Sequence, residues 1–505
     1  MSQLYARKHT GSRHSEPIWD DRKHSTATWQ ICGQLTINRR RTSILFLIAV
    51  LATIAFVFRW LEFTPGETDI SSPPSWKKLQ QWERDLPQHN LELPYPEGKN
   101  GRYVKFDNQI RMLGWNNVFN EVYASPSLPP FNADLNQRLM NTHLAYESKR
   151  AYVFIPYVWK NAYYPWPESK FRENPPVTPL NALISGPSAG GPWEAGDPAP
   201  RSISETWFDV VCPPSERRII VSSDIKKAVK DADGIVIFNH WRDLLRDAPE
   251  RCIEVVAPDQ SVDSFPQTFD LWLWGSDRIL SLWPMFSQSP TSRLLEPSPI
   301  VKAAIERNDY LFLPLGGGSR LSGLRGGTIS PYERMLAIHV RRGDFSEACV
   351  DRAKWNSTFY SWNLLPELPD PFVRPPGGGD GTTTPEHTAV YMKRCFPSLE
   401  AVVRKVREAR EEYVEKSKKN RTTLDTLFLM TNEHPGEWLN TLKATMRAEG
   451  WDTIVTSREL TLDKEQVEVG MAVDMEIARR AAVFIGNGVC SFIVFVICML
   501  MVVVD

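Results

Sequence analysis

Two adjacent arginines follow a short apolar run and are themselves followed by a glycine and an aspartate. The segment reads HVRRGDF and covers residues 339–345. An arginine binds phosphate well because its planar guanidinium forms two charge-assisted hydrogen bonds at once. Gly343 lets the backbone turn close to a ligand, and Asp344 could accept from a base or ribose or hold an arginine in place. The motif indicates a site for a phosphorylated ligand; a surface cluster of ion pairs is the competing interpretation.

Two further polar clusters suit the same kind of ligand. Residues 114–117 read GWNN, and a glycine turn with small amides presents backbone N–H groups to phosphate. Asp474 lies on a predicted helix ahead of the segment GNGVCS at residues 486–491. The glycines of that segment permit a tight turn from a strand into a helix, which Asp474 could reach. A plain turn and a solvent-exposed helical aspartate are the simpler interpretations of these two clusters.

Other chemistries have less support. Asp231 and Asp233 resemble the acidic pair with which some transferases bind a divalent metal, but a solvated turn explains them better. The seven cysteines show no CxxC or CxxH spacing, which argues against a zinc site. The sequence contains neither HExxH nor GxSxG, so a metalloprotease or a serine hydrolase is not indicated. The formal net charge of -1 gives no indication of a nucleic-acid partner.

The elements that must position these clusters alternate in the second half of the chain. Short apolar runs predict strands, and longer amphipathic stretches predict helices. The predicted strands are residues 335–340, 427–431, 452–456 and 482–486, and the predicted helices are residues 397–416, 435–449 and 463–480, with a loop over 363–388. This alternation predicts βαβ units around a parallel sheet. Ligands of such sheets bind beyond the carboxyl ends of the strands, where the polar clusters fall.

The first half of the chain has the same character but is less regular. We predict a helix over residues 135–148 and strands over 151–156, 218–222 and 234–238. Residues 314–331 are rich in glycine and match neither a P-loop nor a dinucleotide fingerprint, so they are interpreted as a linker. The fold class is therefore α/β, with two Rossmann-like halves that face a cleft.

An uncharged run over residues 43–58 predicts a membrane anchor over 43–61. Arg39, Arg40 and Arg41 precede it, which places the N-terminal tail, residues 1–42, in the cytosol. A cleaved signal peptide is the alternative, but it would begin closer to Met1. Residues 62–99 contain several prolines and are predicted to be a stem.

The chain beyond a type II anchor is lumenal, and cysteines pair in that compartment. We expect Cys212 to pair with Cys252 and Cys349 with Cys395, and free buried thiols are the alternative. The sequons at Asn356 and Asn420 are possible glycosylation sites in the same compartment.

The segment IHVRRGDF at residues 338–345 resembles the signature of the GDP-fucose-dependent fucosyltransferases, especially the protein O-fucosyltransferase-like group. Other segments resemble motifs of that group in the same order along the chain. They are GWNN at 114–117, MTN at 430–432, GWD at 450–452, VD at 473–474 and FIGNG at 484–488. The similarity extends loosely over residues 100–490.

The resemblance implies a GT-B architecture with an N-terminal domain over residues 100–315, a linker over 316–331 and a C-terminal nucleotide-sugar-binding domain over 332–505. It implies transfer of fucose from GDP-fucose, with inversion and without an obligatory metal, to a hydroxyl of a protein or glycan acceptor. The enzyme would be a single-pass type II protein of the Golgi or ER membrane, held in the lipid bilayer by residues 43–61.

The resemblance also implies roles for individual residues. Arg341 would bind the β-phosphate and stabilise the leaving GDP, which is electrostatic catalysis. A general base must deprotonate the acceptor, and Glu347 is the nearest carboxylate after the motif. The remaining predicted site residues contact the donor: His339 and Asp344 support the nucleotide, Asp474 holds guanine, Ser491 lies near the phosphates, and Gly114, Asn116 and Asn117 close over the sugar nucleotide.

Three departures from the family pattern keep other functions open. The tail over residues 489–505 is apolar, and no Lys or Arg follows Arg480. Residues 125–130 read SPSLPP where the family continues into a helix, and residues 347–349 read EAC where relatives often have a His-Cys pair. The alternatives to an active fucosyltransferase are therefore a catalytically inactive, membrane-anchored protein that binds a GDP-sugar, and a transferase that uses another sugar nucleotide.

Overall fold

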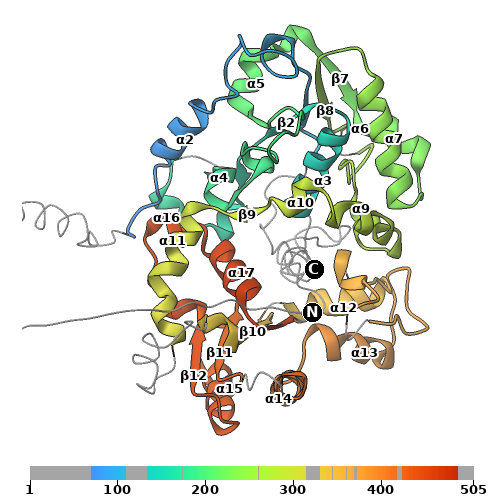
Figure 1. Ribbon diagram of the computed structural model, residues 1–505. Helices are drawn as coiled ribbons and strands as arrows, with labels where there is room; N and C mark the ends of the chain where they lie inside the picture. The colour runs from blue at the N-terminus through green and yellow to red at the C-terminus, as the bar shows by residue number, and fades with distance from the viewer. Residues whose placement is uncertain are drawn as a thin grey trace, which may run out of the picture. The chain divides into compact units, whose positions relative to one another are not determined.

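The computed structural model describes residues 70–109, 134–172, 175–259, 261–313, 330–343, 345–359, 361–368, 372–417 and 423–486, which are coloured in Figure 1. The chain divides into two units, Met1–Gly66 and Glu67–Asp505, and all described residues belong to the second. The predicted cytosolic tail and the predicted anchor at 43–61 therefore lie outside the described residues. Within the described ranges, no helix has the length and apolar character needed to cross a membrane.

The first sheet contains 5 strands in the order β6-β2-β1-β8-β7, and every neighbouring pair is parallel. The strands are β1 (Tyr103–Phe106), β2 (Ala151–Phe154), β6 (Ile203–Ser204), β7 (Arg217–Val221) and β8 (Cys252–Val256). The chain runs from β1 outward to β6 and then returns on the other side of β1. The topological switch point of this sheet therefore lies between β1 and β8, where open α/β sheets bind ligands.

Helices connect these strands and confirm part of the sequence prediction. α3 (Asp134–Glu147) matches the helix predicted over 135–148, and β2 and β7 match the strands predicted over 151–156 and 218–222. The strand predicted over 234–238 is wrong, because these residues begin the helix α7 (Gly234–Asp247). Phe238, Trp241 and Leu245 are fully buried on one side of α7, a spacing of three to four residues that only a helix produces.

The second sheet contains 4 strands in the order β12-β11-β10-β13, again all parallel. They are β10 (Met335–Val340), β11 (Thr426–Thr431), β12 (Thr453–Thr456) and β13 (Val483–Gly486), so all the strands predicted in this half are confirmed. The chain moves from β10 to β12 on one side and then crosses to β13 on the other. The switch point of this sheet therefore lies between β10 and β13, and Arg341 directly follows β10.

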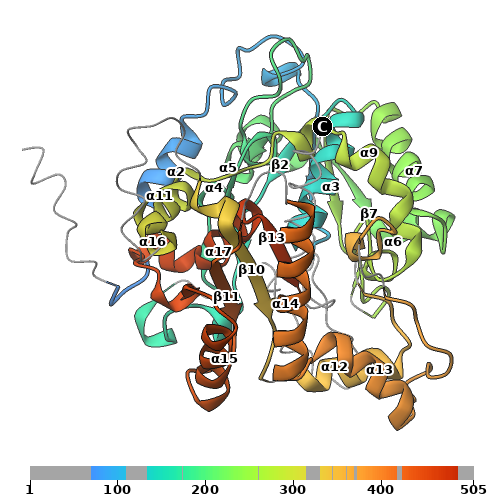
Figure 2. The same ribbon diagram turned by 60° about the horizontal axis from the view of Figure 1, so that its bottom comes forward.

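Helices cover both faces of the second sheet. On one face, the even-numbered residues of β10 pack in one cluster with apolar residues of α14 (Leu399–Lys416) and α15 (Glu437–Ala448); Figure 2 shows both helices. On the other face, the odd-numbered residues Met335 and Ala337 share a cluster with α17 (Gly470–Arg480). The helix predicted over 463–480 is interrupted at Val469, which separates α16 (Lys464–Glu468) from α17.

Two helices precede α14. The sequence prediction missed α12 (Phe345–Lys354), which begins directly after the arginine motif. The predicted loop over residues 363–388 ends earlier than expected, because α13 (Pro385–Cys395) begins inside it. Both predicted disulfides are present, and Cys349–Cys395 joins α12 to α13, whereas Cys212–Cys252 joins the end of α5 (Glu205–Val211) to β8.

One apolar core is continuous between the two sheets. It includes residues of both halves, and the rings of Trp274 and Trp362 lie 5.8 Å apart, centre to centre. The described part of the predicted stem, residues 70–99, also packs into this body. Trp76 is 6% exposed just before α2 (Lys77–Arg84), and the Gln88 amide donates to two backbone carbonyls of the first half. Buried aromatic and amide side chains therefore tie residues 70–99 to the fold.

Candidate functional site

Arg341 lies at the carboxyl end of the central strand of the second sheet. It is 6% exposed, and its odd number places it on the face of β10 that α17 covers. Its guanidinium lies over the ring of Phe345, 5.5 Å from the centroid, in the first turn of α12. Gly343 has a φ of +67°, a left-handed conformation that glycine adopts without strain, and it turns the chain from β10 into α12.

His339 is buried two residues before Arg341, on the same face of β10. Burial, and to a lesser extent the positive charge of Arg341, lowers the pKa of its imidazole to about 3. The imidazole is therefore neutral at physiological pH. The positive charge at the carboxyl end of β10 therefore comes from Arg341 and Arg342.

Arg342 joins several segments at this strand end. Its backbone N–H donates to Oδ1 of Asn432 over 2.7 Å, and the Asn432 amide donates back to its carbonyl over 2.8 Å. Its guanidinium lies over the rings of Phe396 and Trp438, at 4.3 and 4.4 Å, and donates to the carbonyl of Pro397. Arg342 therefore connects β10 to the residues after β11 and to the segments that begin α14 and α15.

A chain of polar contacts links the carboxyl ends of β10, β11 and β12. Arg342 pairs with the carboxylate of Glu433 at 3.4 Å, and the carbonyl of Glu433 accepts a hydrogen bond from Arg458, which follows β12. The neighbouring Ser457 donates to Oδ2 of Asp474 over 2.7 Å. Asp474, on α17, therefore lies at the same edge of the sheet as the arginine motif, two strands away from it.

Asp474 has a carboxyl group in an unusual state. The residue as a whole is partly buried, but its Oδ1 atom is inaccessible to solvent and accepts no hydrogen bond from the residues that the structure describes. Burial raises the pKa of this carboxyl to about 7, against the opposing effects of the Ser457 hydrogen bond and the charge of Arg458. A buried acceptor without a donor is costly. A ligand with N–H groups could supply the missing donor once the atoms that cover this oxygen move aside.

The structure does not single out Glu347 as a base. It lies in the first turn of α12 with an exposed side chain, and its carboxylate makes no contact with a hydrogen-bond donor or cation among the described residues. Its proposed role stays a prediction.

Several predicted site residues lie outside the described residues: Asp344, Ser491, Gly114, Asn116 and Asn117. The predicted loop at 114–117 follows β1, whose carboxyl end adjoins the switch point of the first sheet. Asn108 fixes the chain just after β1, because its amide donates to the carbonyl of Pro266 and to Thr268 at 2.9 and 3.1 Å.

Two residues at the carboxyl edge of the second sheet were given no role from the sequence. Asn432 directly follows β11 and Ser457 directly follows β12. Both residues directly follow predicted strands, and that position could have identified them as candidate site residues from the sequence. The acidic pair Asp231 and Asp233, by contrast, lies in the turn before α7, and no group of three potential metal ligands occurs in the described parts of the chain.

No family model matches the chain, and a search of the curated proteins finds no match. The resemblance to fucosyltransferases therefore depends on the sequence motifs alone.

Proposed function

We propose that this chain is a GDP-fucose-dependent glycosyltransferase of the GT-B type that transfers fucose, with inversion, to a hydroxyl of a protein or glycan. The proposal includes a type II anchor at residues 43–61 and a Golgi or ER location for the catalytic region. Its structural support is the pair of parallel, Rossmann-like sheets, each with a switch point at which a nucleotide-binding segment is predicted.

The observation that carries the proposal is the placement of Arg341 and Asp474 along one edge of the second sheet. Adjacent strands are about 4.8 Å apart, so the ends of β10 and β12 are separated by roughly 10 Å. A nucleoside diphosphate can span that separation. Guanine presents two neighbouring N–H donors, which match the two carboxyl oxygens of Asp474, one of which has no donor among the described residues. The β-phosphate presents the oxygens that a guanidinium binds.

In the reaction, the acceptor oxygen forms a bond to C1 of fucose on the face opposite the phosphate. The bond between C1 and the phosphate oxygen breaks, its electron pair stays on GDP, and the acceptor proton passes to a general base, for which Glu347 is the candidate. Arg341 stabilises the charge that develops on the β-phosphate, and one such donor is typically worth about 3–4 kcal/mol. Phe345 orients the guanidinium. No step needs a metal, because Arg341 supplies the positive charge.

The proposal is tested by calorimetric titration of the full-length chain in detergent with GDP-fucose. Arg341→Ala should weaken binding by about a hundredfold or more, as expected for loss of a charge-assisted bidentate contact. Arg404→Ala is the matched control, since Arg404 is an exposed arginine on α14 and should bind like the wild type. Equal affinity of all three proteins, or no binding by folded wild type, would contradict the site. Parallel titrations with GDP-mannose and UDP-glucose test the choice of nucleotide sugar.

A second candidate is a protein that binds GDP-fucose without turning it over. Two features favour it. The exposed carboxylate of Glu347 has no donor or cation beside it among the described residues, and the apolar tail has no basic residue. Transfer of labelled fucose to a mixed protein and glycan acceptor preparation separates the two. Tight, Arg341-dependent binding with no transfer would favour the inactive protein.

A further inference from the structure

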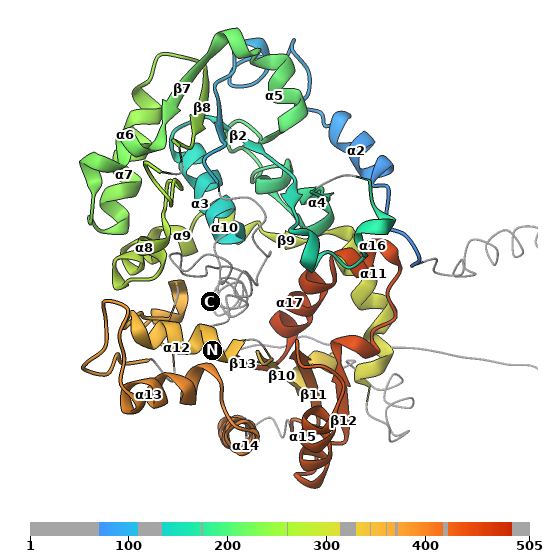
Figure 3. The same cartoon turned by 180° about the vertical axis from the view of Figure 1, so that it is seen from behind.

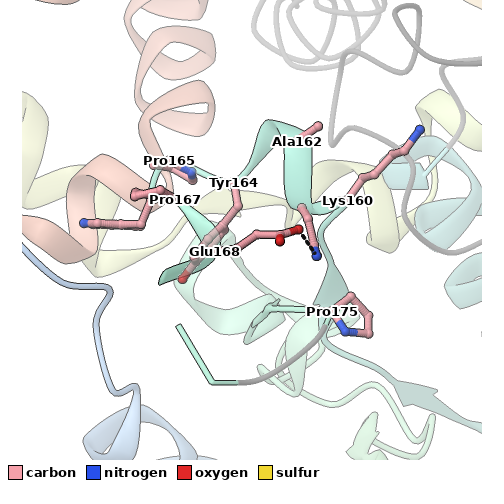
Figure 4. Close-up of a pocket in the computed structure, with 9 residues that line it drawn as sticks. Lys160, Ala162, Tyr164, Pro165, Pro167, Glu168 and Pro175 are labelled. Atoms are coloured by element: carbon pink, nitrogen blue, oxygen red, sulfur yellow. Dashed lines mark hydrogen bonds between the residues drawn. The ribbon is translucent and has the colours of Figure 1, made fainter. Parts of the chain in front are cut away.

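A cavity of about 620 Å³ lies in the segment that connects β3 (Tyr157–Val158) to β4 (Val177–Thr178) (Figure 4). This volume is within the range of roughly 300–1,000 Å³ that is typical of small-molecule sites. Polar and aromatic side chains line it: Lys160, Asn161, Tyr164, Trp166 and Glu168, with prolines between and opposite them. The prolines restrict the backbone, so the walls are stiff before a ligand arrives. The reaction proposed above uses none of these residues.

We propose that this cavity binds a neutral saccharide unit. The Asn161 amide donates to the carboxylate of Glu168 over 2.8 Å. Lys160 also belongs to the lining, but its side chain extends away from Glu168 (Figure 4). A saccharide hydroxyl both donates and accepts hydrogen bonds, so it can bind a carboxylate and an amide placed side by side. A phosphorylated or strongly acidic ligand would meet the carboxylate of Glu168 instead.

The aromatic residues favour a saccharide over an extended proline-rich peptide. A groove for such a peptide presents several exposed aromatic rings. Trp166 is only 5% exposed here, and its indole N–H donates to the backbone carbonyl of Ile70 over 2.8 Å. The Tyr164 ring is partly exposed and packs edge-on against Trp159 and Phe171. The Tyr164 ring, held in place by these neighbours and flanked by polar groups, offers a surface on which the apolar face of a single sugar ring can pack.

A buried hydrogen bond connects the cavity wall to the helix of the nucleotide site. The Tyr164 hydroxyl donates to Glu468 over 2.8 Å, and Glu468 is fully buried at the end of α16. α17, which carries Asp474, begins at Gly470 after the interruption at Val469, and a helical rise of about 1.5 Å per residue puts Asp474 about 6 Å along α17. Figures 1 and 3 show α16 and α11 (Pro299–Asn308) beside α4 (Leu180–Leu183), which follows β4. The saccharide would therefore be part of a glycan acceptor, an assignment that rests on the proposed function.

The test uses saturation-transfer NMR on the full-length chain in detergent with four neutral disaccharides: lactose, N-acetyllactosamine, cellobiose and maltose. We expect at least one to bind in the millimolar range and to bind at least tenfold more weakly to Glu168→Ala and to Asn161→Ala. Glu306→Ala is the control, because Glu306 is an exposed glutamate on α11, outside the cavity lining. GDP-fucose affinity is measured on the same samples and should be equal in all four proteins.

The outcomes separate the cavity from the proposed function. If the chain binds GDP-fucose but none of the disaccharides, or if both cavity variants bind disaccharide like the wild type, the saccharide site is refuted and the donor site stands. If disaccharide binding depends on Glu168 while GDP-fucose does not bind, the cavity stands and its assignment to an acceptor falls. Binding of a proline-rich peptide in place of the disaccharides would also overturn the proposal.

Discussion

Binding of GDP-fucose should depend on pH through the carboxyl group of Asp474. The pKa of this group is raised to about 7 by burial, so the free protein is about half protonated at neutral pH. Guanine offers only N–H donors along the edge that faces a carboxylate, and both oxygens of Asp474 must accept. In the protonated form of Asp474, one carboxyl oxygen carries a hydrogen, so an O–H donor would face an N–H donor of guanine and no hydrogen bond could form there. Binding therefore selects the ionised form, and affinity should fall as the solution becomes more acidic.

The size of the effect is set by the ionised fraction. With a pKa of about 7, about nine-tenths of the Asp474 carboxyl groups are ionised at pH 8 and about one-tenth at pH 6. Affinity should therefore decrease about tenfold between these two values. The ligand contributes nothing to this change, because both phosphates of GDP-fucose are esterified and keep their charge. The imidazole of His339, with a pKa of about 3, stays neutral over this range.

The substitution Asp474→Asn supplies the control. An amide has nearly the same shape but accepts with only one atom and does not ionise, so binding at pH 8 should weaken by about tenfold or more. The pH profile of the variant should be flat. The same substitution tests folding. Because the folded pKa is raised from 3.8 to about 7, the ionisation of Asp474 lowers stability as pH rises from about 4 to about 7, and the loss is complete above that range. The variant should therefore melt at a higher temperature than wild type at pH 8, and the difference should be smaller at pH 5.

Calorimetric titration with GDP-fucose at several pH values, together with thermal melts, makes both measurements. A wild-type affinity that does not change between pH 6 and pH 8 would refute the reasoning about Asp474. An equal slope in the Asn variant would show that another group titrates. A variant that is stabilised relative to wild type at pH 5 but not at pH 8 would contradict the direction of the pKa shift.

Three other substitutions test how the fold supports this edge of the sheet, each by urea denaturation. Arg342→Ala should lower the free energy of unfolding by about 2 kcal/mol, because it removes two cation–π contacts and a hydrogen bond; a change as small as that of the exposed Arg404→Ala would contradict this structural role. Glu468→Ala should lower the free energy of unfolding by about 3–5 kcal/mol, since it leaves the buried donors of Trp76, Tyr164 and Thr178 without their acceptor. Glu468→Gln keeps one acceptor oxygen and should lower it by less. Equal decreases in the two variants would argue against this hydrogen-bond network. Replacing Cys349 and Cys395 together by serine should lower the free energy of unfolding by about 2–5 kcal/mol. Adding a reductant should destabilise the wild type through this disulfide but not the double variant.

Local sequence patterns were sufficient for most of the second sheet. Its strands are short apolar runs bounded by turn residues, and its long helices have a clear apolar stripe. The hydrophobic period and the segment length therefore indicate the same element type in each case. Gly450 has a φ of +81° just beyond α15, a left-handed conformation in which glycine commonly ends a helix. The first half was harder, because its short apolar runs fit either period. Residues 234–238 form a helix only because the residues after them, including Trp241 and Leu245, bury a face with helical spacing.

The sequence by itself predicted that an arginine pair follows a strand of a parallel sheet, since strand, turn and polar motif follow one another within a few residues. The position of that strand inside the sheet came from the structure. The tertiary structure decided what Arg342 contacts, because the rings around it come from segments far away in the chain. It also decided the state of Asp474, because burial and the lack of a second donor among the described residues are not local properties. The partnership of Trp76 with Glu468 spans 392 residues. Such contacts depend on how the elements pack against one another, and no local pattern contains that information.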